Sequence, residues 1–250
     1  MKIVVIGGTG LIGTKVVSRL RARGHEVLAA SPKEGVDTLT GKGLVEALRG
    51  AEVVIDVTNS PSFADADVLA FFETSTRNQL AAEREAGVKH HVALTIVGTD
   101  RVPDSGYFRA KVAQEARIAA GPTPYTLVHA TQFHEFVDAV LGSLTEGDVI
   151  RAPTAYIQTV ASDDVADAVV DAALAAPTNG RVQVAGPEAL RFDELARRVN
   201  AVRGTKREVV TDPTATYFGA RLEERSLIPD QGAARLGKIR LEDWLRAANK

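Results

Sequence analysis

The first fifteen residues, MKIVVIGGTGLIGTK, constrain the fold more than any other stretch of this chain. A short apolar run, Ile3 to Ile6, is typical of a buried strand. The run stops at GGTG, and apolar residues then return at helical spacing at Ile12, Val16 and Leu20. The sequence therefore predicts a strand that turns through glycines into an amphipathic helix.

A glycine turn ahead of a helix suits a phosphate group. The helix N-terminus presents unpaired N–H groups and partial positive charge, and glycine lets a ligand come close to the main chain. Gly7, Gly10 and Gly13 have the spacing G-x-x-G-x-x-G, a variant of the G-x-G-x-x-G turn that binds dinucleotides. Such a turn also occurs for packing alone, but its position on the first strand favours a dinucleotide.

The end of the second expected strand, 26–30, bears on which dinucleotide binds. A carboxylate about 20 residues past the glycines would hold the ribose 2′-hydroxyl of NAD. That place falls near Ser31, with Lys33 close by, and the first acid, Glu34, comes later. A hydroxyl and a cation suit the 2′-phosphate of NADP, which a carboxylate would repel. We therefore expect NADP (NADPH), with NAD as the alternative; an ordinary polar turn would give the same residues.

Further along, strand-like and helix-like segments alternate. Strands are expected at 36–39, 52–57, 91–96, 125–128, 148–150, 156–160 and 181–185, and helices at 43–48, 65–86, 107–120, from 134 to about 144, from 161 onward, at 192–202 and at 241–248. Repeated βα units predict an α/β fold, a doubly wound parallel sheet with helices on both faces. We expect a single domain over 1–250, with its core at about 1–145, while 146–250 completes the core and forms a small C-terminal substrate lobe.

Tyr107 and Lys111 are four residues apart at the start of an expected helix, so they share one helix face. The unperturbed pKa of tyrosine is about 10, and a nearby cation lowers it by stabilising the phenolate. The lysine would also hold the nicotinamide ribose. Thr95, at the end of the preceding strand, is the best-placed hydroxyl to orient a substrate carbonyl. These residues predict a tyrosine that donates a proton to a substrate oxygen.

Thr58 and Asn59 follow the strand at 52–57, in a polar loop at the edge of the sheet where cofactors bind. We expect them to contact ribose or phosphate. The alternative is an ordinary turn before Pro61.

The histidines give little support for a metal site. His90 and His91 are adjacent in a strand and would point to opposite faces, which predicts a solvated strand end. His129 and His134 lack the carboxylates that would complete a metal site, although His134 could line a substrate pocket.

Composition excludes several classes of function. The 250 residues carry a formal net charge of −2 at pH 7, which gives no reason to expect a nucleic-acid or membrane partner. The chain has no cysteine, so disulfides and thiolate chemistry are excluded. No apolar run reaches the roughly 18 residues of a membrane span. The first strand starts directly after Met1 and Lys2, so we expect no signal peptide. We expect a cytoplasmic protein with a small-molecule substrate and no metal; the oligomeric state is open.

With GGTGLIG at its start and the Tyr107/Lys111 pair, the chain resembles the short-chain dehydrogenase/reductase superfamily. The segment TIVGTDRVPDSGYFRAKVAQE narrows the resemblance to the atypical, NmrA-like NAD(P)H-binding branch. The likeness covers about residues 1–200. It implies a Rossmann-like core, with the cofactor across the strand ends and the substrate under the C-terminal lobe.

The resemblance also assigns roles to residues. It implies that Thr9, Leu11 and Ile12 contact the cofactor phosphates through their main chain, beside the three glycines. It makes Tyr107 the proton donor and Lys111 the ribose anchor.

The resemblance leaves three functions to compare. The leading expectation is an NADPH-dependent oxidoreductase that reduces a carbonyl or related electrophile, with Thr95 where the superfamily commonly has a serine. The branch also contains proteins that sense NADP(H) without catalysis, and this is the alternative. A nucleotide-sugar epimerase or dehydratase is a further alternative, which the short C-terminal region disfavours.

Overall fold

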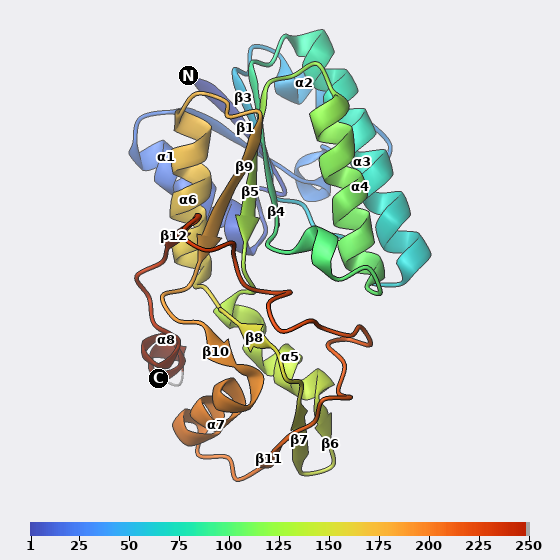
Figure 1. Ribbon diagram of the computed structural model, residues 1–250. Helices are drawn as coiled ribbons and strands as arrows, with labels where there is room; N and C mark the ends of the chain where they lie inside the picture. The colour runs from blue at the N-terminus through green and yellow to red at the C-terminus, as the bar shows by residue number, and fades with distance from the viewer. Residues whose placement is uncertain (249–250) are drawn as a thin grey trace. The chain divides into compact units, whose positions relative to one another are not determined.

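The computed structural model describes residues 1–248, and the chain divides into two compact units. Unit 1 comprises residues 1–95, 106–129 and 165–182, and unit 2 comprises 96–105, 130–164 and the chain from 183 onward. Seven strands form a parallel sheet in the order β12-β9-β5-β4-β3-β1-β2 (Figure 1). Among the described residues, no helix is long and apolar enough to cross a membrane.

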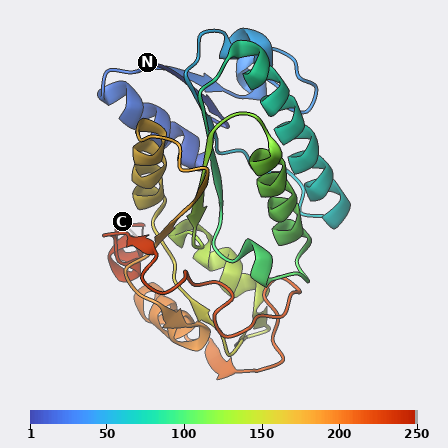
Figure 2. The same ribbon diagram turned by 45° about the horizontal axis from the view of Figure 1, so that its top comes forward.

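Unit 1 alternates strands with helices. The elements that lie wholly or mostly in it are β1 (Lys2–Ile6), α1 (Leu11–Ala22), β2 (Glu26–Ala30), the 3-10 turn η1 (Pro32–Glu34), α2 (Leu44–Leu48), β3 (Val53–Asp56), α3 (Asp65–Ala86), β4 (His90–Ile96), α4 (Gly106–Ala120), β5 (Tyr125–Ala130) and α6 (Ser162–Leu174). Figures 1 and 2 show α1 and α6 on one face of the sheet and α3 and α4 on the other. The predicted α/β class is confirmed.

Unit 2 consists of shorter elements. They are η2 (Thr99–Arg101), η3 (His134–Phe136), α5 (Val137–Ser143), β6 (Thr145–Glu146), β7 (Val149–Ala152), β8 (Tyr156–Ile157), β10 (Leu190–Arg191), α7 (Phe192–Arg203), β11 (Glu208–Thr211), β12 (Ala234–Leu236) and α8 (Leu241–Ala248). Strand β9 (Gly180–Ala185) passes from unit 1 into unit 2. Two small sheets lie in this unit, β10-β8 and β11-β7-β6. Its role as a substrate lobe stays a prediction.

Strand β1 lies inside the parallel sheet, paired with β2 on one side and β3 on the other. Its residues Ile3 to Ile6 are all buried. A parallel strand covered on both faces needs apolar residues at every position, which explains the unbroken apolar run in the sequence. The same arrangement brings the ends of β1, β2 and β3 to one edge of the sheet.

The prediction of a strand at 36–39 is wrong: Val36 and Asp37 are irregular, and Thr38 and Leu39 lie in a turn. The carboxylate of Asp37 accepts the N–H of Leu39 at 2.8 Å, and the amide of Asn78 donates to the carbonyls of Thr38 and Leu39. Aspartate competes with strand pairing because its side chain bonds the main chain two residues on.

The solvated strand end expected at His90 and His91 is also wrong. Both side chains are buried, because β4 has β3 on one side and β5 on the other. His90 Nε2 lies 2.9 Å from Thr126 Oγ1, and His91 Nδ1 lies 2.6 Å from Glu83 Oε1. Burial and the charge of His91 lower the pKa of His90 to about 4. Burial also opposes the charge of His91, but the adjacent Glu83 and the more distant Asp56 outweigh it and raise its pKa.

We expect Glu83→Gln to lower the free energy of unfolding by about 3 kcal/mol at pH 6, because it breaks a buried ion pair. The folded-state pKa of His91 is raised, so the pair contributes fully below the unfolded pKa near 6.5. Its contribution is lost as the pH rises through the folded-state pKa of His91. Above that pKa, the free energies of unfolding of the variant and of wild type should therefore differ less. Urea unfolding at pH 6 and pH 9 measures this.

The exposed Glu85, on the same helix, supplies the control Glu85→Gln, which we expect to match wild type. If Glu83→Gln lowers the free energy of unfolding equally at both pH values, the ion pair is contradicted.

Candidate functional site

The turn between β1 and α1 depends on close main-chain contacts. A Cβ at Gly13 would lie 2.1 Å from the carbonyl oxygen of Gly7, and one at Gly8 would lie 2.8 Å from Cα of Ala29. Gly7 has φ +79° and approaches the main chain of Val57. The glycines therefore let α1 start directly against the ends of β1, β2 and β3.

Gly10 has a different environment. It is the N-cap of α1, where no side chain caps the helix and no acid occupies the first turn. Apart from its chain neighbours, the only described atom within 4 Å of a Cβ at Gly10 would be the Gly7 carbonyl oxygen, at 3.3 Å. Thr9 and Leu11 are exposed beside it, while Ile12 is buried. The first N–H groups of α1 thus start beside open space, and the turn fits a phosphate.

The end of β2 carries a buried hydroxyl. Ser31 Oγ has no hydrogen-bond partner among the described residues, although Ser31 is almost fully buried. Lys33, two residues on in η1, is exposed. A buried hydroxyl without a partner is costly, and a ligand that hydrogen-bonds it would remove the cost.

The loop after β3 is ordered by its own polar groups. Asp56 Oδ1 accepts both the N–H of Thr58, at 2.9 Å, and its hydroxyl, at 2.7 Å. Asn59 Oδ1 accepts the N–H of Ser60 at 3.0 Å and the Tyr107 hydroxyl at 2.8 Å. The hydroxyl of Thr58 is therefore directed to Asp56, and Asn59 meets the tyrosine.

Tyr107 lies among aromatic rings. Its ring centroid is 5.5 Å from that of Phe63 and 6.0 Å from that of Phe72. Burial raises the pKa of Tyr107 to about 12. The expectation that Lys111 lowers this pKa is wrong for the chain alone, because the ammonium group of Lys111 bonds elsewhere.

Lys111 is buried, and its Nζ donates to the carbonyl oxygen of Leu94 at 3.0 Å and to Oε1 of Gln114. It also lies 4.3 Å from the ring centroid of Phe72, the ring that Tyr107 contacts. Burial lowers the pKa of Lys111 to about 8, and the carboxylates of Asp56 and Glu115 oppose this shift. At neutral pH the side chain therefore carries a proton.

Thr95 follows Leu94 at the end of β4 and is buried. Its hydroxyl has no hydrogen-bond partner among the described residues. The bond from Lys111 to Leu94 ties helix α4 to the strand end that carries this hydroxyl.

Sequence reasoning missed the polar cluster behind Lys111. Asp56 Oδ2 accepts Nε2 of Gln114 at 3.0 Å and Nε2 of Gln79 at 3.2 Å, and all three side chains are buried. Two patterns could have revealed it. Asp56 is an acid at the end of an otherwise apolar strand, and Gln114 is three residues after Lys111 on the same helix.

His134 and His129 have structural contacts. His134 Nδ1 lies 2.9 Å from Thr159 Oγ1, and its Nε2 lies 3.2 Å from the carbonyl oxygen of Ile239, all within unit 2. His129 Nε2 lies 3.3 Å from Glu115 Oε1 in unit 1. Over residues 1–248, no group of three or more histidine, aspartate and glutamate side chains is placed to hold a metal ion.

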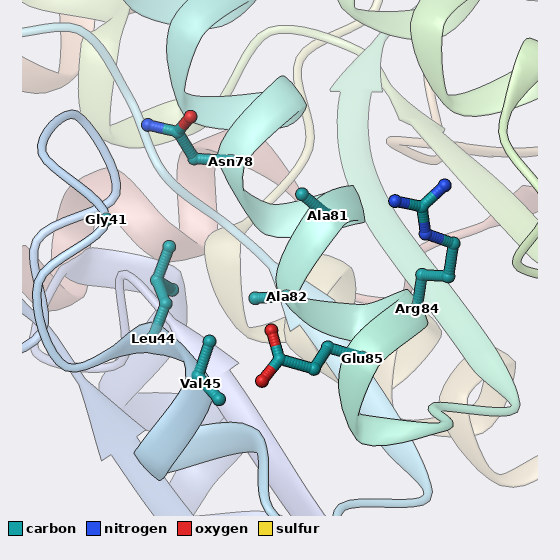
Figure 3. A pocket seen from close by; sticks show the side chains of 8 residues that line it. All are labelled: Gly41, Leu44, Val45, Asn78, Ala81, Ala82, Arg84 and Glu85. Atoms are coloured by element: carbon teal, nitrogen blue, oxygen red, sulfur yellow. The ribbon is translucent and has the colours of Figure 1, made fainter.

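A pocket of about 460 Å³ lies beside α2 and α3 (Figure 3). None of the residues predicted to bind cofactor or substrate lines it. Its walls are short or apolar side chains with charged groups on α3; they are Gly41, Leu44, Val45, Asn78, Ala81, Ala82, Arg84 and Glu85. The pocket is thus separate from the candidate site.

We expect Gly13→Ala to lower the free energy of unfolding by about 2 kcal/mol, because its Cβ would overlap the Gly7 carbonyl oxygen. Gly10→Ala is the matched control, with an expected loss of less than about 1 kcal/mol, because that Cβ would lie 3.3 Å from the same oxygen, which a small shift relieves. Urea unfolding compares them. Equal losses in the two variants would contradict the close contact at Gly13.

Comparisons with known proteins agree with this turn and fold. Residues 3–118 match the NAD dependent epimerase/dehydratase family. A 147-residue segment is 24% identical to the photosystem II assembly factor Ycf39 of Synechocystis, covering 53% of this chain and 45% of that protein. A 40-residue segment is 52% identical to the epimerase family protein SDR39U1 of Bos taurus, covering 16% of this chain and 14% of that one. The chain thus spans less than half the length of these curated relatives.

Solved structures match over most of the chain. A short-chain dehydrogenase/reductase superfamily protein of Agrobacterium tumefaciens with bound NAD has a TM-score of 0.74 at 18% identity, covering 99% of this chain and 96% of that one. The UDP-glucose 4-epimerase of Thermus thermophilus, in complex with NAD, has a TM-score of 0.71 at 20% identity, covering 98% and 97%. At this identity the likeness shows the fold. The family match over residues 3–118, together with this shared fold, bears out the predicted resemblance of the chain to the short-chain dehydrogenase/reductase superfamily.

Proposed function

We propose that this protein is an NADPH-dependent reductase of a small carbonyl compound or related electrophile. One observation carries the proposal. Lys111 is buried and bonded to the main chain of Leu94, beside the unpartnered hydroxyl of Thr95, and Tyr107 contacts the same Phe72 ring as Lys111. An acid, a cation and a free hydroxyl on adjoining elements are the groups that carbonyl reduction needs.

The glycine turn and the end of β2 would hold the cofactor. The N–H groups at the start of α1 suit its pyrophosphate, and Gly10 leaves room for it. The hydroxyl of Ser31 and the charge of Lys33 suit a 2′-phosphate, so NADPH is preferred over NADH in this proposal. When bound, NADPH supplies the hydride.

The chain itself would supply orientation and the proton. The Tyr107 hydroxyl now donates to Asn59 Oδ1, so it would leave this acceptor for the substrate oxygen and then donate its proton there. Thr95 would donate a second hydrogen bond to the same oxygen. The ammonium group of Lys111 is protonated below its pKa of about 8 and would hold the nicotinamide ribose.

We expect Tyr107→Phe to lower kcat by about 100-fold or more, because it removes the proton donor while keeping the ring. NADPH affinity should stay within about twofold, since the phenol is not assigned to the cofactor. The measurement is NADPH oxidation with a panel of quinones, aldehydes and ketones, together with NADPH binding by fluorescence.

Tyr125→Phe is the matched control, because Tyr125 lies on β5 outside the polar cluster of the site. Full turnover in Tyr107→Phe would remove the tyrosine from the mechanism.

We expect Lys33→Ala to weaken NADPH binding about tenfold, because the 2′-phosphate would lose a charged partner. NADH binding should not change. The control is Lys42→Ala, which removes another exposed lysine from the following loop. Calorimetric titration of both cofactors measures the effect, and an unaltered NADPH affinity in Lys33→Ala would overturn the proposed 2′-phosphate contact.

A second candidate is a non-catalytic NADP(H)-sensing protein. The contacts of the chain alone favour it, because the Tyr107 hydroxyl donates to Asn59 and the Lys111 ammonium group bonds Leu94 and Gln114 instead of the phenol. Burial also raises the pKa of Tyr107, which makes the phenol a weaker acid. Cofactor binding without turnover on the panel, and with a strong preference for one redox state, would support this candidate. Epimerisation leaves the cofactor in its starting redox state, so the epimerase alternative is tested separately, by NMR of UDP-glucose incubated with the protein and NAD; a structural neighbour of nearly the same extent is a UDP-glucose 4-epimerase.

A further inference from the structure

A continuous hydrogen-bond chain connects the half-buried Thr58, in the loop after β3, to the buried Lys111. Thr58 donates two hydrogen bonds to Asp56 Oδ1, and Gln114 donates one to Asp56 Oδ2 at 3.0 Å. The amide oxygen of Gln114 then accepts from the ammonium group of Lys111. Asp56, Lys111 and Gln114 are each at most 2% exposed. Every link lies in unit 1.

The two ends of this chain fix the orientation of the Gln114 amide. An ionised carboxylate only accepts hydrogen bonds and an ammonium group only donates them. The amide must therefore direct its nitrogen to Asp56 and its oxygen to Lys111. The reverse orientation would set donor against donor at Lys111 and acceptor against acceptor at Asp56.

We propose that Gln114, oriented by Asp56, is a positioning residue that holds the Lys111 ammonium group ready for the nicotinamide ribose. This inference rests on the proposed function, which assigns Lys111 to that ribose. An ammonium group has three N–H bonds, and Gln114 and the Leu94 carbonyl take two of them. The third then has a fixed direction and is left for a ribose hydroxyl.

The charged groups near Lys111 are Asp56 on β3 and Glu115 on α4, and both carboxylates favour its protonated form. The ring of Phe72 on α3 contacts the ammonium group from another side. Among the described residues, Asp56 is connected to Lys111 by hydrogen bonds only through Gln114.

Two variants break this series of hydrogen bonds at different points. Gln114→Leu removes the acceptor beside Lys111 and keeps the approximate size of the side chain. Asp56→Asn keeps the Lys111 side chain and its two acceptor residues but removes a carboxylate that favours its protonated form, so the decisive comparison is between Gln114→Leu and Gln79→Leu. Thr58 retains the oxygen of the new amide, so the NH₂ group of the asparagine faces the NH₂ group of Gln114. The Gln114 amide must then turn its donor toward Lys111.

Gln79→Leu is the matched control. Gln79 is buried and donates to the same oxygen of Asp56, at 3.2 Å, and to Ser75, but it is not bonded to Lys111. Its loss should lower Tm about as much as Gln114→Leu does, without moving Lys111.

The first readout needs no cofactor. In protein labelled with ¹³C-lysine, the Cε resonance of Lys111 is identified by its absence in Lys111→Arg and followed by NMR against pH. We expect its midpoint to fall by about one pH unit in Gln114→Leu and Asp56→Asn, and to stay at the wild-type value in Gln79→Leu. The second readout is NADPH affinity, which should fall about tenfold in the first two variants and less than twofold in the control.

If Gln114→Leu matches Gln79→Leu in both readouts, the inference is overturned, whether or not Asp56→Asn folds. A wild-type chain that does not bind NADPH would instead refute the proposed function. The NMR midpoint in the cofactor-free chain would still decide whether Gln114 holds Lys111.

Discussion

The contact between Gly13 and the carbonyl oxygen of Gly7 is the constraint on which the candidate site depends. A side chain at Gly13 would overlap main-chain atoms of the turn, so helix α1 starts there only because glycine has none. Gly7 approaches Val57 in the same way, which brings the end of β3 against the turn. A helix N-terminus is thereby fixed beside the ends of β1, β2 and β3, and its free N–H groups open toward the place where a phosphate fits.

A buried carboxylate organises the other half of the site. Asp56 ends β3 and accepts hydrogen bonds from Thr58, Gln79 and Gln114. An isolated buried charge would be strongly destabilising, and these donors compensate it. The same donors connect the loop after β3 with helices α3 and α4. Asp56 therefore acts both on the stability of unit 1 and, through Gln114, on the geometry of Lys111.

The strands and helices of unit 1 could be predicted where one periodicity was unambiguous. Residues 65–86 form α3 with the expected bounds, and 26–30 form β2, because apolar spacing and glycine stops agree there. The prediction failed at 36–39, where the side chain of Asp37 bonds its own loop. It also failed at His90 and His91, because burial by neighbouring strands and the partner Glu83, eight residues away, cannot be read from local sequence.

The sequence by itself determined the α/β order, the glycine turn and the spacing that puts Tyr107 and Lys111 on one helix, since each follows from residues within a few positions of one another. The tertiary structure alone decided what these side chains contact. It directs the Tyr107 hydroxyl to Asn59, 48 residues away, and links Lys111 to Asp56 through Gln114. It also raises the pKa of Tyr107 and lowers that of Lys111, because both shifts come chiefly from burial, and only packed neighbours bury a side chain.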